Sequence, residues 1–269
     1  MGNLERSARQ ASNSPAMAAV AKFGLFARGF IYLVIGWLAV QIALGHHTHE
    51  ANQRGALVTV AGHPFGQVLL WILGFGFGAY ALWRLSEAAF GTAAEGRKTG
   101  PRLQSLIRGV VYATFAVTTF SFIAGTSNQT QSRQQETTTA KLMKHGYGRW
   151  LVGIVGVIVI VVGIGLIIEG LRKKFEKQLR MDELHGVTRT VVVRLGMVGT
   201  TSRGIVFAVA GALLVQAALQ YQPAKSTGLD GALRTLADQP YGPWLLGAIA
   251  VGLIAFGVYG LFTARFAKT

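Results

Sequence analysis

The stretch Arg28-Gly29-Phe30-Ile31-Tyr32 returns twice along the chain, as Arg108-Gly109-Val110-Val111-Tyr112 and as Arg203-Gly204-Ile205-Val206-Phe207. Each copy places an arginine and a glycine at the start of an apolar run, and an aromatic residue four positions after the arginine. Residues four apart lie on one face of a helix, so each aromatic ring is expected beside its arginine. A motif that recurs at long intervals predicts three similar units. The aromatic residues of these three copies are Tyr32, Tyr112 and Phe207.

The composition favours a membrane protein. Of the 269 residues, 51% are hydrophobic and 14% are charged, whereas a soluble domain has about 25% charged residues. The charges are clustered, and the uncharged runs between them approach the ~20 residues that cross a hydrocarbon core. These runs are 29–45, 64–83, 109–125, 150–168, 204–221 and 241–264. The sequence therefore predicts an all-α integral membrane protein with six transmembrane helices.

The distribution of basic residues predicts the orientation. The formal net charge is +15, and most lysines and arginines fall near the two termini or in the second and fourth connections. This positive-inside pattern predicts a protein of the bacterial cytoplasmic (inner) membrane with both termini in the cytoplasm. The expected partners are membrane lipids, with anionic headgroups on the cytoplasmic side, and not nucleic acid.

The spacing of a second motif sets the unit boundaries. This motif is an aromatic residue followed by a glycine, and its three glycines are Gly66, Gly148 and Gly242. Each lies at nearly the same distance from the arginine of its unit. We predict three helical hairpins of like orientation around a pseudo-threefold axis. The expected segments are a polar tail (1–18), unit 1 (19–90), a basic inner loop (91–102), unit 2 (103–171), a basic inner connection (172–189) and unit 3 (190–269).

Two glutamates repeat with the units. Glu87 and Glu169 follow the glycines Gly66 and Gly148 at the same distance, and Thr263 takes this place in unit 3. A helix that descends about 31 Å from Gly66 would bring Glu87 to the level of Arg28, which predicts Arg28–Glu87 and Arg108–Glu169 ion pairs. Such pairs are interpreted first as staples near the helix ends, and second as an ion or substrate site.

The sequence contains no strong catalytic or metal-binding motif. The chain has no cysteine, no P-loop and no nucleophile or metalloprotease motif, so we expect neither an enzyme nor a cofactor. His46, His47, His49 and His63 are weak candidates for a zinc or copper site, but their spacing matches no strong motif. The glycines of the second helices predict close helix packing.

The combined motifs resemble a known family. They are Ala/Ser-Arg-Gly-x-x-aromatic, Gly-Ala-Leu at Gly55 and Gly231, the aromatic–glycine pair and the late glutamate. Together they are similar to the bacterial membrane family called domain of unknown function 1206, over Ala19–Ala264. The resemblance implies three two-helix units and leaves the activity open. The middle unit departs from the pattern because it lacks Gly-Ala-Leu, and unit 3 departs at Thr263. In unit 3, Asp230 is expected as the N-cap of a short helix.

Two functions from different classes follow. The preferred hypothesis is a non-enzymatic scaffold or accessory subunit that acts through lipid contacts or a membrane-protein partner. The alternative is a small transporter or channel, with anions as the candidate substrates, in which Arg28, Arg108 and Arg203 form a ring at the inner mouth of the axis. An axis packed with apolar side chains would favour the first hypothesis.

Overall fold

A computed structural model describes residues 15–46, 49–91, 99–126, 130–179 and 186–266, and within these ranges it contains helices and no β-strand. Six long helices each carry an apolar window that can cross a membrane, which confirms the predicted fold class. They are α2 (Pro15–Ala43), α4 (Gly66–Phe90), α5 (Thr99–Ile123), α7 (Gly148–Leu171), α8 (Gly186–Gln220) and α10 (Gly242–Phe266).

Shorter helices join the long ones. Within each unit a short helix precedes the second long helix: α3 (Gln53–Ala61), α6 (Gln131–Met143) and α9 (Gly228–Ala237). Two 3₁₀ helices, η1 (Lys174–Gln178) and η2 (Pro223–Lys225), complete the described elements. We call the side of the molecule at α3, α6 and α9 the short-helix end. The order long–short–long therefore occurs three times along the chain.

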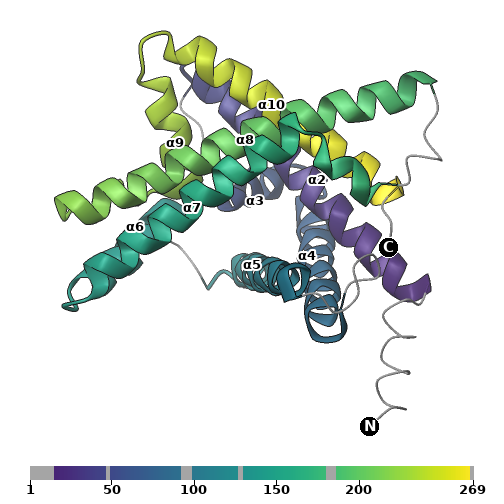
Figure 1. The fold of residues 1–269 in the computed structure, drawn as a ribbon, viewed down its shortest axis with the longest axis horizontal. Helices are drawn as coiled ribbons and strands as arrows, with labels where there is room; N and C mark the ends of the chain where they lie inside the picture. The colour runs from purple at the N-terminus through teal and green to yellow at the C-terminus, as the bar shows by residue number, and fades with distance from the viewer. Residues whose placement is uncertain (1–14, 47–48, 92–98, 127–129, 180–185, 267–269) are drawn as a thin grey trace.

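The long helices pack most extensively across unit boundaries. Helix α4 pairs with α5, α7 with α8, and α10 with α2, so the second helix of each unit packs on the first helix of the next. In Figure 1, α4 and α5 are seen nearly end-on, while the α7–α8 pair crosses the α2–α10 pair. The hairpin partners α2 and α4, and α8 and α10, pack less extensively, and α5 and α7 scarcely touch. This cyclic exchange is compatible with threefold symmetry, which stays a prediction.

The glycine of each repeated arginine–glycine motif explains these pairs. A Cβ on Gly29 would lie 2.9 Å from the carbonyl oxygen of Gly257 in α10, and one on Gly204 would lie 2.7 Å from that of Gly163 in α7. In unit 2, a Cβ on Gly109 would lie 2.8 Å from the side chain of Leu85 in α4. Small residues let membrane helices approach closely, so these glycines make the cross-unit pairs possible.

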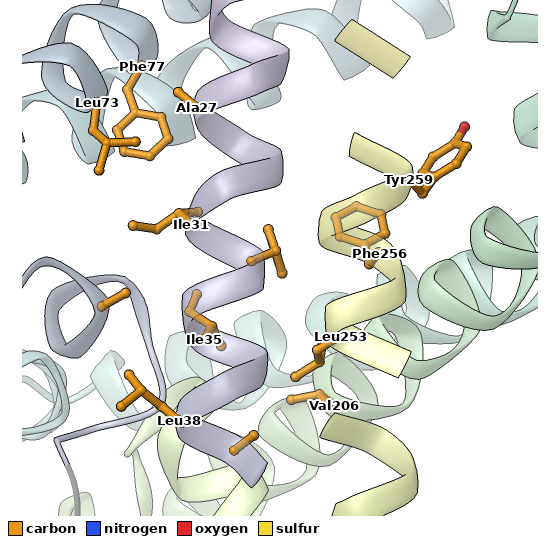
Figure 2. Close-up of a cluster of buried hydrophobic side chains, with 14 of the residues drawn as sticks. Ala27, Ile31, Ile35, Leu38, Leu73, Phe77, Val206, Leu253, Phe256 and Tyr259 are labelled. Atoms are coloured by element: carbon orange, nitrogen blue, oxygen red, sulfur yellow. The ribbon is translucent and has the colours of Figure 1, made fainter. Parts of the chain in front are cut away.

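The core lies where the pairs meet around α2. Figure 2 shows Leu73 and Phe77 of α4 on one side of α2, and Leu253 and Phe256 of α10 on the other. Ile31 of α2 lies between them and is 1% exposed. Burial of large side chains on both sides of one helix fixes the distance between the pairs, because protein interiors are close-packed.

The aromatic–glycine pairs form the turns at the short-helix end. Gly66, Gly148 and Gly242 each begin a long helix directly against the last carbonyl groups of the preceding short helix, where any side chain would collide. The preceding residues Phe65, Tyr147 and Tyr241 are 86%, 89% and 83% exposed. Exposed aromatic rings at the ends of membrane helices are typical of the interface between hydrocarbon and water.

Candidate functional site

Hydrogen bonds link the three units in a cycle at the short-helix end. From unit 1, the Glu50 carboxylate accepts the backbone N–H of Ser132 in unit 2 at 3.3 Å. The Ser132 hydroxyl donates to the carbonyl oxygen of Thr227 in unit 3 at 3.2 Å. The cycle closes where Asp230 of unit 3 accepts the backbone N–H of Ala51 at 2.8 Å. These bonds position the three short helices over the long ones.

Glu50 also acts as the anchor of α6. Its carboxylate accepts the backbone N–H of Gln131 at 3.0 Å and the side-chain amide of Asn52 at 2.7 Å. Burial alone would raise the pKa of Glu50, but the hydrogen bonds from Asn52 and Ser132 outweigh it and hold the pKa below its ordinary value. A carboxylate is therefore favoured at the start of α6, where the helix dipole also stabilises negative charge.

The predicted N-cap of α9 is wrong. Thr227 occupies the N-cap position, and Asp230 lies in the first turn, where it is buried. Asp230 accepts the Nε–H of Arg234 at 2.8 Å in addition to the Ala51 N–H. Both oxygens of the Asp230 carboxylate have partners, and one of these partners, the Ala51 N–H, belongs to unit 1. Asp230 therefore joins units 3 and 1 and does not cap α9.

A cavity of about 550 Å³ lies beneath α6. Amides and hydroxyls from the short helices and their flanking turns line one part, and apolar side chains of the long helices line the rest. Tyr32 and Phe207, two of the three repeat aromatics, are also part of the wall. The polar lining includes Gln53, Gln134, Gln135, Thr138, Thr139 and Ser226, and the apolar lining includes Ile31, Ile35, Phe115, Val159, Ala210 and Leu214. A cavity of this volume and mixed character is typical of small-molecule sites.

The missing Gly-Ala-Leu motif of unit 2 accounts for the cavity. Counted from the aromatic–glycine pair, Thr137-Thr138-Thr139 takes the place of Gly55-Ala56-Leu57 and Gly231-Ala232-Leu233. The alanine and leucine of both intact motifs are fully buried at 0% exposure. In unit 2, Thr138 and Thr139 line the cavity instead. The departure from the motif was visible in the sequence, and it marks where the short helix no longer fills the space below it.

The cavity lies beside α5 and α7. Both helices contribute to its wall, through Phe115 and Val159, yet they scarcely pack against each other. We call this gap in the ring of helices the α5–α7 seam. Because both helices are long and apolar enough to cross a membrane, we expect the seam to face the lipid.

The three repeat arginines lie well inside their helices and not at the helix mouths. Helix α2 begins at Pro15, α5 at Thr99 and α8 at Gly186. At 1.5 Å per residue, Arg28, Arg108 and Arg203 therefore lie roughly 20, 13 and 25 Å from the helix starts. The expected position near the helix ends is wrong, because the arginine that precedes each apolar run does not mark the start of the helix.

The predicted Arg28–Glu87 ion pair does not form. Glu87 binds Arg84 of its own helix at 2.7 Å and accepts the hydroxyl of Ser105 at 3.0 Å. A Cβ on Gly76 would meet the methyl group of Ala27, so Arg28 lies level with the middle of α4. Glu87 is eleven residues further along, or about 16 Å.

The predicted pair in unit 2 does not form either. Arg108 is within electrostatic range of Glu169, but no ion pair joins them in the described chain, because α5 and α7 do not pack on each other. In unit 3 the hydroxyl of Thr263 donates to the carbonyl oxygen of Tyr259 at 2.8 Å. The repeated glutamate position therefore does not act as a staple within the hairpins.

Aromatic rings surround two of the repeat arginines. The guanidinium carbon of Arg203 lies 5.1 Å from the ring centre of Phe207, as expected for residues four apart, and 5.3 Å from that of Tyr32. Arg28 instead lies over Phe256 of α10, at 5.3 Å, and Arg203 lies over the same ring at 5.0 Å. The third repeat aromatic, Tyr112, is buried against Tyr80 at a centroid distance of 4.4 Å.

The histidine candidates are at the surface. His46, His49 and His63 are exposed, and Nδ1 of His63 lies 2.7 Å from the carbonyl oxygen of Thr59. His47 lies outside the described residues. In the ranges that the structure covers, no three His, Asp or Glu side chains are grouped so as to hold a metal ion.

Comparison with known proteins supports the three-unit reading. The family model "Domain of Unknown Function (DUF1206)" matches residues 23–91, 103–173 and 198–267, and each match contains one long, one short and a second long helix. The chain is also similar to "Uncharacterized protein YxxB" of Bacillus subtilis (strain 168), with 30% identity over 89% of this chain and 87% of that protein. No solved structure matches the chain.

Proposed function

Because this chain belongs to the DUF1206 family and is a multi-pass membrane protein, we propose that it is a non-catalytic lipid-binding protein of the membrane. In this proposal it holds the hydrocarbon chain of a membrane lipid in the cavity at the α5–α7 seam. Such a protein would act as a scaffold or accessory subunit through the lipid that it presents.

The observation that carries the proposal is the polarity of the cavity wall. Amides and hydroxyls such as Gln134 and Thr138 lie at the short-helix end, and Ile35, Val159 and Leu214 come from the long helices. A lipid has the same division between a polar head and an apolar chain. The volume of about 550 Å³ accommodates part of one lipid, and the seam gives it a route from the bilayer.

Blocking the cavity tests the proposal. Ala210 of α8 lines the cavity, whereas Ala212 of the same helix is exposed and does not. In Ala210→Trp the indole fills the space. We expect at least tenfold less lipid to purify with this variant in mild detergent than with the wild-type protein. Native mass spectrometry and extraction of the bound lipid measure this.

Ala212→Trp is the matched control, because it adds the same indole to the same helix outside the cavity. It should keep the wild-type amount of bound lipid. Equal lipid content in the two variants, or a wild-type protein with less than stoichiometric lipid, contradicts the proposal.

The orientation in the bacterial inner membrane is part of the proposal and rests on the distribution of Lys and Arg. Single cysteines at Lys98 and Lys225 test it, since the chain has no native cysteine. With both termini in the cytoplasm, a membrane-impermeant thiol reagent added to intact cells labels position 225 and spares position 98. The opposite pattern reverses the orientation.

A further inference from the structure

Two half-buried arginines, Arg28 and Arg203, each have a buried Nε atom without a hydrogen-bond partner among the described residues. The Nε atoms of Arg28 and Arg203 are inaccessible to solvent, and neither donates a hydrogen bond within the described residues. Both side chains lie deep within helices that span the membrane. An unsatisfied charged donor in such a place is costly, so its persistence points to a ligand.

The surroundings stabilise the positive charge only in part. Arg203 lies over the rings of Tyr32, Phe207 and Phe256, and Arg28 shares the ring of Phe256. Figure 2 shows Phe256 projecting from α10 in the region beside α2. Aromatic faces attract cations, but they accept no conventional hydrogen bond from the edge of a guanidinium group.

The carboxylates of the described residues do not neutralise the charges of these arginines. The Glu87 carboxylate forms an ion pair with Arg84 of the same helix and accepts a hydrogen bond from the hydroxyl of Ser105. In the part of the chain that the structure describes, no Asp or Glu forms an ion pair with Arg28, Arg108 or Arg203. Arg108 lies within electrostatic range of Arg28, which adds a third positive charge to the region.

We infer that Arg28 and Arg203 form an anion-binding site. The ligand is a small anion, such as a halide or an oxyanion, that accepts the N–H groups which the protein leaves unpaired. The phosphate of an anionic lipid has the same chemistry and is the other source of such a group. Arg28 and Arg203 do not line the lipid cavity, although Tyr32 and Phe207, which do, also lie beside Arg203.

Thermal unfolding of the purified full-length protein tests the inference. After removal of lipid, the wild type is titrated with chloride or phosphate against gluconate at constant ionic strength. An anion that binds the folded state raises the melting temperature in a saturable manner, by roughly 5 °C or more at about 100 times Kd. In Arg203→Gln this rise should disappear. Arg172→Gln removes an exposed arginine at the end of α7 and should keep it.

Two further measurements separate the sources and do not depend on a variant that folds. Chloride NMR linewidths report exchange of dissolved chloride with the wild-type site, and phosphate should compete for it. If the anion is a lipid phosphate, vesicles of phosphatidylglycerol raise the melting temperature while chloride and phosphate do not. Either pattern supports the site. A wild type that responds to none of these anions, or an equal response in Arg203→Gln, overturns it.

Discussion

The α7–α8 contact and the α5–α7 seam differ in the residues at matching positions. Along α7–α8, glycines alternate between the helices, and a Cβ on Gly156, Gly163 or Gly170 would meet backbone of α8 at 3.0 Å or less. Helices α5 and α7 scarcely pack on each other, and the surface of α7 outside the α8 contact includes exposed bulky β-branched residues such as Val157, Val161 and Ile164. In a membrane, apolar surface alone gives little reason for helices to associate, because lipid solvates it equally well.

The contrast teaches that close backbone approach, and not hydrophobicity, decides which helices pair in this protein. Helix α7 has the highest mean hydropathy of the six spans, 3.2, and yet only 17% of its apolar window is buried. Changing the glycines, the anchor of α6 or the short helix above the seam tests this difference directly.

The largest effect on stability is expected at the closed contact. In Gly163→Ala the new methyl group lies 2.7 Å from the carbonyl oxygen of Gly204, and we expect a loss of about 1–3 kcal/mol. Gly165→Ala is the matched control, because a Cβ there has no neighbour within 4 Å. In the control the higher helix propensity of alanine should leave stability unchanged or raise it by up to ~1 kcal/mol. Denaturant unfolding in detergent measures both, and an equal loss would refute the role of close approach.

A smaller effect is expected where α6 is anchored. Glu50→Gln removes the charge that accepts the N–H groups of Gln131 and Ser132, and we expect a loss of about 1 kcal/mol after allowance for solvent. Because folding lowers the pKa of Glu50, its contribution is complete above the ordinary value of 4.5 and is lost as pH falls through the lowered value.

The pH dependence gives a second measurement of the same anchor. The melting temperature of the wild type should fall below pH 4.5 more steeply than that of Glu50→Gln. Glu136→Gln, also on the short-helix end, should retain the wild-type slope. Parallel curves for the wild type and Glu50→Gln would remove Glu50 from this role.

Restoring the alanine and leucine of the Gly-Ala-Leu motif in unit 2 should fill the cavity with little change in the free energy of unfolding. In Thr138→Ala/Thr139→Leu, burial of the leucine contributes about 2 kcal/mol, and the loss of the Thr139–Ser226 hydrogen bond (2.8 Å) costs about 1 kcal/mol. We expect the variant to melt slightly higher and to lose its bound lipid. Unchanged lipid content would show that unit 2 does not form the cavity through this motif.

The smallest effect is expected for ion flux, the alternative function. Tyr32, Tyr112 and Phe256 are buried between the long helices, so we expect no anion flux above that of empty liposomes. Arg203→Gln should therefore leave the flux unchanged. A flux in the wild type that this substitution abolishes would favour the transporter hypothesis.

The sequence predicted the helices better than their partners. Uncharged runs located all six spans, and the constant arginine-to-glycine distance indicated hairpins of like orientation. The pairing across units was not foreseen, because glycines occur on several faces and a single sequence does not say which faces meet. The depth of Arg28 was missed because Arg28 itself bounds the uncharged run 29–45, whereas α2 begins at Pro15.

Of the candidate site residues, Tyr32 and Phe207 line the cavity and Arg28 and Arg203 gather around Phe256. Phe256 itself was not singled out, since it is one of many apolar residues of α10 and is not part of the motifs that were compared. Glu50 was also missed as an anchor, because its partners lie in the next unit and the hydrogen bonds depend on tertiary structure. The local pattern located the unusual unit, and only the fold showed what its departure leaves open.

The pairing of α2 with α10 joins two helices that are synthesised far apart in time. A ribosome adds about 5–20 residues per second, so roughly 10–40 s separate the end of α2 at Ala43 from the start of α10 at Gly242. During that interval Arg28 has entered the bilayer, while the Phe256 ring that will cover it has not been made. The nascent chain therefore holds a charged span whose partner, α10, is made later, and the ring of helices closes only after α10 has been synthesised.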